Sequence, residues 1–229
     1  MKACDVIVKE REKQLKECKD ELLQGLKAGI KREKAITPSA PQSLFHEWIS
    51  NCRDGEVDDD EALKIVNDLI DEAGVGIIKA KPKKDDKIKE LKEKEKAQIW
   101  EHREKTHELR RLAKELVGRV RSLRYFTVVR DLQRQREKPP RISCPSCGKD
   151  NLPIGDVSVL SSCGHVGCVD CVKTRAESEE CVYVENGCKS AARILNIVKA
   201  DTLGVDDVKR DGRGKHFGMK LEKVVHIIK

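Results

Sequence analysis

Apolar residues recur at every third or fourth position through the first 36 residues, with lysine and glutamate between them. The repeat is carried by Leu15, Cys18, Leu22, Leu26 and Ile30. Such spacing puts the apolar side chains on one face and predicts an amphipathic α-helix. Two prolines within residues 37–41 end the pattern, because proline lacks the amide hydrogen that a helix interior needs.

Two shorter helices are predicted next. Residues 44–52 place three large side chains on one side, namely Phe45, Trp48 and Ile49. Asp58 and Glu61 have the spacing of a capping box, which satisfies free amides at a helix start. The helix behind them ends near Gly74 and carries Leu63, Val66, Leu69 and Ile70 on one face. We expect residues 1–80 to form short helices that pack on the element that follows.

One very long helix is predicted from about residue 85 to residue 136, since this stretch has no proline and a single glycine, Gly118. At 1.5 Å per residue its length would be roughly 75 Å. Its second half carries a stripe at coiled-coil spacing, formed by Leu109, Leu112, Leu116, Val120, Leu123, Val128 and Leu132. Such a stripe needs a partner, and the N-terminal helices are the nearest one. Pro139 and Pro140 end the helix.

Charge is spread unevenly along the chain. The formal net charge is +7, and residues 83–141 hold 20 Lys/Arg against 11 Asp/Glu. Six arginines flank the stripe of the long helix: Arg110, Arg111, Arg119, Arg121, Arg124 and Arg130. A basic segment can attract DNA or an acidic partner, and a solvated helix face is the alternative. Aromatic residues make up only 3%, which argues against stacking on single-stranded nucleic acid and against one large core.

Seven cysteines and one histidine lie within 45 residues. They are Cys144, Cys147, Cys163, His165, Cys168, Cys171, Cys181 and Cys188. Eight such ligands suffice for two closed tetrahedral sites, so we predict two structural zinc ions and no metal-activated water. The spacing allows two pairings. Either the first four and the last four residues form the sites, or the two sets interleave along the chain.

The remaining cysteines, Cys4, Cys18 and Cys52, have no second ligand nearby and are interpreted as ordinary thiols. The N-terminus lacks the apolar stretch of a signal peptide, and no apolar run is long enough for a transmembrane helix. Ten cysteines in such a chain indicate metal binding rather than disulfides. We expect a soluble intracellular protein with no membrane contact, located in the nucleus or the cytoplasm, of which the nucleus is preferred.

The order of three cysteines, one histidine and four cysteines resembles the RING finger of ubiquitin ligases. The most specific part is CGHVGCVDC, residues 163–171. The resemblance implies the interleaved, cross-braced pairing, in which Cys144, Cys147, Cys168 and Cys171 bind one ion and Cys163, His165, Cys181 and Cys188 bind the other. It also implies docking of a ubiquitin-conjugating enzyme charged with ubiquitin. Such a ligase works by positioning, so no catalytic residue is expected.

The same resemblance implies the residues that would contact this partner. Ser146 would lie in the first zinc loop, where the family often has an aliphatic residue. Val172 would line an apolar groove. Tyr183 and Val184 would add contacts from the second zinc loop, and Lys189 would be a cation that bridges ubiquitin and its carrier. The gap of six residues between the last two cysteines is wider than the two that are usual in the family.

The flanks resemble the middle of a helicase-like ATPase of the Swi/Snf type, where a RING finger is inserted between two ATPase lobes. The long basic helix and GMKLEKVVHIIK, residues 218–229, carry this resemblance. No GxxxxGK[ST] loop occurs, and residues 212–215 are too short a match, so no ATPase activity is expected of the chain itself. The final pattern breaks off as it would in a truncated domain.

The sequence therefore predicts a mainly α protein in four parts. Residues 1–80 form short helices on the arm, and 81–140 form the long basic helix. Residues 141–195 form a small cross-braced RING-type zinc module with little β structure, and 196–229 form a linker and an amphipathic helix. The function indicated is that of a RING-type ubiquitin ligase on chromatin. The alternative is a non-enzymatic, zinc-stabilised helical scaffold or a DNA-associated module derived from a helicase-like ATPase.

Overall fold

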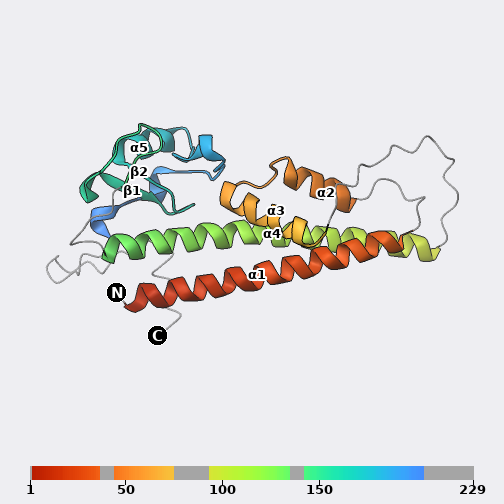
Figure 1. Ribbon diagram of the computed structural model, residues 1–229. Coiled ribbons are helices and arrows are strands. Elements are labelled where there is room, and N and C mark those ends of the chain that lie inside the picture. The colour runs from red at the N-terminus through yellow and green to blue at the C-terminus, as the bar shows by residue number, and fades with distance from the viewer. Residues whose placement is uncertain (1, 37–43, 75–92, 135–141, 204–229) are drawn as a thin grey trace.

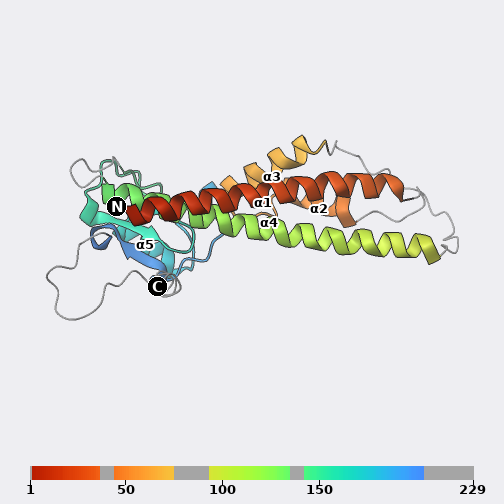
Figure 2. The same cartoon turned by 90° about the horizontal axis from the view of Figure 1, so that it is seen from below.

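A computed structural model describes residues 2–36, 44–74, 93–134 and 142–203. Two long antiparallel helices, α1 (Lys2–Ala35) and α4 (Glu93–Arg134), lie side by side in both views (Figure 1, Figure 2). The short helices α2 (Leu44–Arg53) and α3 (Asp60–Glu72) pack on this pair. A compact cysteine-rich module, residues 142–203, lies over the C-terminal half of α4 (Figure 1).

The main core lies where the four helices α1 to α4 meet. Its largest fully buried side chains are Leu22, Leu26, Phe45, Val66, Ile70 and Leu116. Burying each such side chain contributes about 1.5–3 kcal/mol. A Cβ atom on Gly29 would lie 2.6 Å from the Phe45 ring, so the glycine is what lets α2 approach α1 this closely. No cysteine of the ligand sets belongs to this core.

The module is built on a small antiparallel sheet in the order β2-β1-β3. Its strands are β1 (Val157–Leu160), β2 (Val166–Cys168) and β3 (Ile197–Lys199). Helix α5 (Val169–Glu177) follows β2 directly. Single turns of 3₁₀-helix complete it: η1 (Ile154–Asp156), η2 (Val184–Asn186), η3 (Ile194–Asn196) and η4 (Ala200–Thr202). One apolar cluster joins the module to Leu132 of α4, and a second contains Leu160, Val172 and Val182 together with three of the predicted ligand cysteines.

The prediction of a mainly helical chain with little β structure is confirmed. The helix predicted through the first 36 residues is confirmed as α1, which continues for 34 residues through Gly25 and Gly29 and so is longer than the short helices expected for residues 1–80. Both glycines lie where neighbouring side chains come close, so packing offsets their weak helix propensity. The N-cap of α3 is Asp59, which accepts from the Ala62 amide, rather than the predicted Asp58.

Helix α4 runs unbroken through most of the predicted arm. Residues 85–92 and 135–136, and the predicted amphipathic helix at 220–229, lie outside the described residues. The stripe packs against α1 from Leu109 to Val120, as expected, whereas Leu132 contacts the module instead. None of the helices described is long and apolar enough to cross a membrane.

Candidate metal centre

Four cysteines from two turns converge near the C-terminal end of α4. We call Cys144, Cys147, Cys168 and Cys171 the outer group. Their sulfur atoms all lie within 4.8 Å of one another, and the Cys147 and Cys168 sulfurs are 3.8 Å apart. The first turn closes because the Gly148 amide donates to the Cys144 carbonyl (2.9 Å), with Gly148 in the left-handed region at φ +70°. In the second, Cys168 caps α5.

The inner group consists of Cys163, His165, Cys181 and Cys188, whose ligand atoms also lie within 4.8 Å of one another. The Cys181 sulfur is 3.5 Å from the Cys163 sulfur and 3.4 Å from Nδ1 of His165. The imidazole stacks on Tyr183 with ring centroids 4.2 Å apart, which fixes the plane of the ring. Cys163, Cys181 and Cys188 are buried, whereas Cys147 of the outer group is exposed.

The sulfur spacing suits a metal ion rather than a disulfide. Four sulfurs about 2.3 Å from a tetrahedral centre are about 3.8 Å from one another. A disulfide would hold two sulfurs at about 2.05 Å, and all ten cysteines are free thiols. Each group can therefore hold one metal ion. Of the two pairings that the spacing left open, the structure brings the interleaved sets together.

Crowding of the thiols shifts their proton affinities in opposite directions. In the inner group, hydrogen bonds from Cys163 and Cys181 to its sulfur lower the pKa of Cys188. The pKa of Cys181 is raised, first by its hydrogen bond with Cys163 and then by that with Cys188. Burial would raise the pKa of Cys144, but backbone hydrogen bonds, first that of Cys168, lower it to about 6. Burial and the neighbouring Cys168 raise the pKa of Cys171 to about 12. A bound cation would relieve this competition, because thiolates are the ligand form.

Three of the residues predicted to contact a partner have roles inside the chain. Val172 is fully buried in the apolar cluster that includes Cys163, Cys181 and Cys188, so it lines no open groove. Tyr183 stacks on His165. The Lys189 ammonium donates to the Gly55 carbonyl at 3.0 Å, which ties it to the loop between α2 and α3. Of the rest, Val184 is half-buried in η2 and Ser146 is exposed.

Most of the arginines that flank the stripe of α4 pair with acidic side chains of the chain itself. The pairs are Arg110–Glu56 (2.8 Å), Arg119–Glu115 (2.7 Å), Arg121–Asp59 (3.4 Å), Arg124–Asp59 (2.7 Å) and Arg130–Asp131 (2.8 Å). Each of these pairs uses N–H donors and positive charge of a guanidinium within the chain and so leaves fewer of them for a phosphate. Contact with DNA through this helix stays a prediction.

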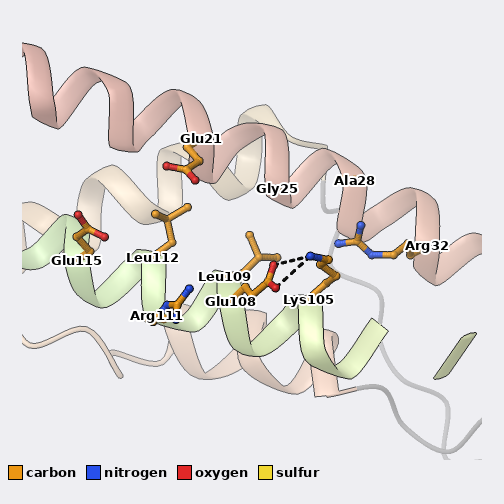
Figure 3. Close-up of a pocket in the computed structure, with 10 residues that line it drawn as sticks. All are labelled: Glu21, Gly25, Ala28, Arg32, Lys105, Glu108, Leu109, Arg111, Leu112 and Glu115. Carbon is orange, nitrogen blue, oxygen red and sulfur yellow. Dashed lines mark hydrogen bonds and ion pairs between the residues drawn. The ribbon is translucent and has the colours of Figure 1, made fainter. Parts of the chain in front are cut away.

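A cavity of about 300 Å³ opens between α1 and α4, and no cysteine lines it (Figure 3). Its charged lining is three acidic and three basic side chains: Glu21, Glu108, Glu115, Arg32, Lys105 and Arg111. Lys105 and Glu108 pair with each other at 2.9 Å. Because the charges balance, the cavity has no excess charge that would select an anion or a cation, and we assign it no ligand.

The contacts that attach the module to the helices have no signal in the sequence. Arg124 is one of six flanking arginines, and Asp59 is one of three successive aspartates. The structure brings them together although 65 residues separate them. Gly164 has a similar role, since it touches the backbone of α4 at Tyr125.

No family model matches the chain. The chain is 35% identical over 248 aligned positions to a protein named DNA (cytosine-5-)-methyltransferase DMT5 from Cryptococcus neoformans var. grubii. The alignment includes 99% of this chain and 10% of that protein. The chain thus spans about a tenth of the length of the curated relative it matches.

This relative corrects the functional prediction from the sequence. The match is to a DNA methyltransferase, and neither a RING finger nor an ATPase family model matches. The interpretation of the chain as a RING-type ubiquitin ligase, or as the middle of a Swi/Snf-type ATPase, is therefore wrong. Cysteine and histidine spacing specifies metal geometry and says little about the partner of the folded module. The burial of Val172 agrees with this correction.

Proposed function

We propose that this chain is a zinc-stabilised accessory module of a DNA-methylating protein, with a structural and positioning role. The supporting observation is that its likeness to a DNA (cytosine-5-)-methyltransferase extends over 99% of the chain, through helices and cysteine-rich module alike. Such a protein would act where DNA is, so we propose a nuclear location.

Zinc is the metal that best suits the two groups. The outer group offers four sulfurs, and the inner group offers three sulfurs and one imidazole nitrogen. Both sets are typical of structural zinc, which prefers four protein ligands in a tetrahedron. With every position taken by protein, no site is left for an activated water, so the zinc ions would stabilise the fold.

The other thiols do not suggest catalysis by this segment. Burial raises the pKa of Cys18 to about 11 and that of Cys52 to about 12, and it also raises the pKa of Cys4. A nucleophilic cysteine needs the opposite shift. Among the described residues, therefore, no thiol outside the ligand groups is activated, which favours a supporting role.

Native mass spectrometry tests the metal. The chain should carry two zinc ions, Cys188→Ser should lose one, and Cys52→Ala should keep both because Cys52 lies in the helical core. Absence of zinc from the purified chain would contradict the proposal.

A chimera tests the role. The matching tenth of the Cryptococcus methyltransferase is replaced by this chain, and DNA methylation by the purified chimera is measured. Activity should be retained, lost with Cys163→Ser, and unaffected by Cys52→Ala. If the chimera with Cys163→Ser methylates DNA as well as its parent, the supporting role is wrong.

A further inference from the structure

The inner group lies where the module meets α3 and α4. Gly164, between the ligands Cys163 and His165, has φ +80°, and a Cβ atom there would lie 2.5 Å from the Tyr125 amide nitrogen. The loop that carries two of the four ligands therefore touches the backbone of α4 directly. A residue with a side chain cannot occupy this position without displacing the loop.

Arg124 connects this loop to the start of α3. Its guanidinium donates to the Cys163 carbonyl at 3.0 Å and to both carboxylate oxygens of Asp59 at 2.7 and 3.0 Å. It also reaches Glu61 at 2.7 Å. The Asp59 side chain is only 1% exposed and that of Arg124 16%, so water does little to screen the pair. We call Asp59, Arg124 and the Cys163 carbonyl the arginine bridge.

The loop that carries another ligand of the inner group, Cys188, is attached to the same region. The amide of Lys189, next to the ligand Cys188, donates to the Asp58 carbonyl at 3.0 Å. Gly187 faces Asp60, since a Cβ atom on this glycine would lie 3.1 Å from the Asp60 Cβ atom. The loop that carries Cys188 therefore contacts the N-terminus of α3 directly, whereas the loop that carries Cys163 is joined to it through Arg124.

The outer group is attached differently. Cys144 shares an apolar cluster with Leu132 of α4. Within the described part of the chain, no hydrogen bond joins the loops of the outer group to helices α1 to α4. Apolar contacts tolerate small displacements of the loop, whereas the hydrogen bonds of a buried ion pair do not.

We propose that the inner group is a metal-dependent latch: a metal ion there and the seating of the α3 N-terminus on α4 stabilise each other through the arginine bridge. This inference rests on the proposed zinc binding. The ion fixes the Cys163 loop, the loop fixes its carbonyl, and the carbonyl helps to orient Arg124 toward buried Asp59. Coupling of this kind is reciprocal. If a bound metal ion stabilises the arginine bridge by a given factor, then breaking the bridge must lower metal affinity by the same factor.

Cobalt(II) titration against a competing chelator tests the latch on the full chain. The inner group, with its nitrogen ligand, and the all-sulfur outer group give cobalt distinguishable visible spectra. Arg124→Met should weaken cobalt binding at the inner group by about 5- to 150-fold, the usual range for coupled sites. Binding at the outer group should not change. Arg119→Met is the matched control, since Arg119 pairs with Glu115 and Gln14 away from the joint.

Asp59→Asn is the second variant, in case Arg124→Met does not fold. Asparagine preserves the helix cap and removes the charge, so the same selective loss is expected. In the unchanged protein, removing metal should also speed hydrogen exchange at the first turn of α3. Equal cobalt affinity in Asp59→Asn and the parent, with unchanged exchange at α3, would overturn the latch while leaving zinc binding intact. Failure of the parent chain to bind cobalt at either group would overturn the zinc proposal itself.

Discussion

Asp59 is a fully buried carboxylate that caps α3. Burial alone would raise its pKa, but hydrogen bonds and the charge of Arg124, together with the Ala62 amide, lower it below the usual value. A lowered folded-state pKa means that the charged form stabilises the fold. This stabilisation is complete above the pKa of the unfolded chain and is lost as the pH falls through the folded-state pKa.

We therefore expect Asp59→Asn to lower the free energy of unfolding of the metal-loaded protein by about 3 kcal/mol. This is the low end for breaking a buried pair, because Glu61 still contacts Arg124. Urea denaturation at about pH 6 and about pH 8 should give the same difference, since Asp59 stays ionised throughout that range. A difference that varies between these two pH values would contradict the assignment of the charge.

At the scale of elements, glycines decide how closely the helices and the metal loops approach one another. Gly29 of α1 faces the Phe45 ring of α2, whereas a Cβ atom on Gly118 of α4 would have nothing within 4 Å. Gly164 and Gly148 form a similar pair in the metal loops. Both have positive φ, but only Gly164 touches another element.

Gly29→Ala and Gly118→Ala should shift stability in opposite directions. Alanine favours a helix over glycine by about 1 kcal/mol, so Gly118→Ala should raise the free energy of unfolding by up to that amount. Gly29→Ala should lower it, because overpacking of a buried ring costs about 1–3 kcal/mol and exceeds the gain. Chemical denaturation checks both variants. A stabilised Gly29→Ala protein would mean that α1 and α2 do not pack as described.

Gly164→Ala should destabilise the module more than Gly148→Ala does. Both substitutions put alanine in the left-handed region, at a cost of about 1 kcal/mol or more. Only Gly164→Ala also forces a contact with the backbone of α4. Thermal unfolding of the metal-loaded proteins measures the difference. Equal effects of the two substitutions would show that the loop does not rest on α4.

At the scale of the whole molecule, the helical core and the metal module are stabilised by different means. The main core contains apolar side chains of α1 to α4 and no metal ligand. The module has few large apolar residues, and its two smaller clusters include five of the ligand cysteines: Cys144, Cys163, Cys168, Cys181 and Cys188. The module should therefore depend on metal for its fold, and the helix pair should not.

Removing metal with a strong chelator should unfold the module and leave the helix pair. In hydrogen-exchange mass spectrometry, protection should be lost across residues 144–200 and kept around Leu22 and Leu116 at the centre of the helical core. The circular dichroism signal of helices should persist for the most part. Uniform loss of protection along the chain would contradict this division.

The sequence by itself determined helices α1 to α4 and the eight candidate ligands, because both depend on residues near one another in the chain. The stripe of α4 and the pattern from Cys144 to Cys188 are local signals of this kind. Residue spacing left the pairing of the ligands open; the interleaved sets, which the RING-finger resemblance implied, are the ones that the structure brings together. Only the tertiary structure decided that Val172 is buried and that Lys189 binds the loop before α3. The bridge from Arg124 to Asp59 joins residues 65 positions apart. Such a pair depends on how the helices stack, and no local spacing encodes it.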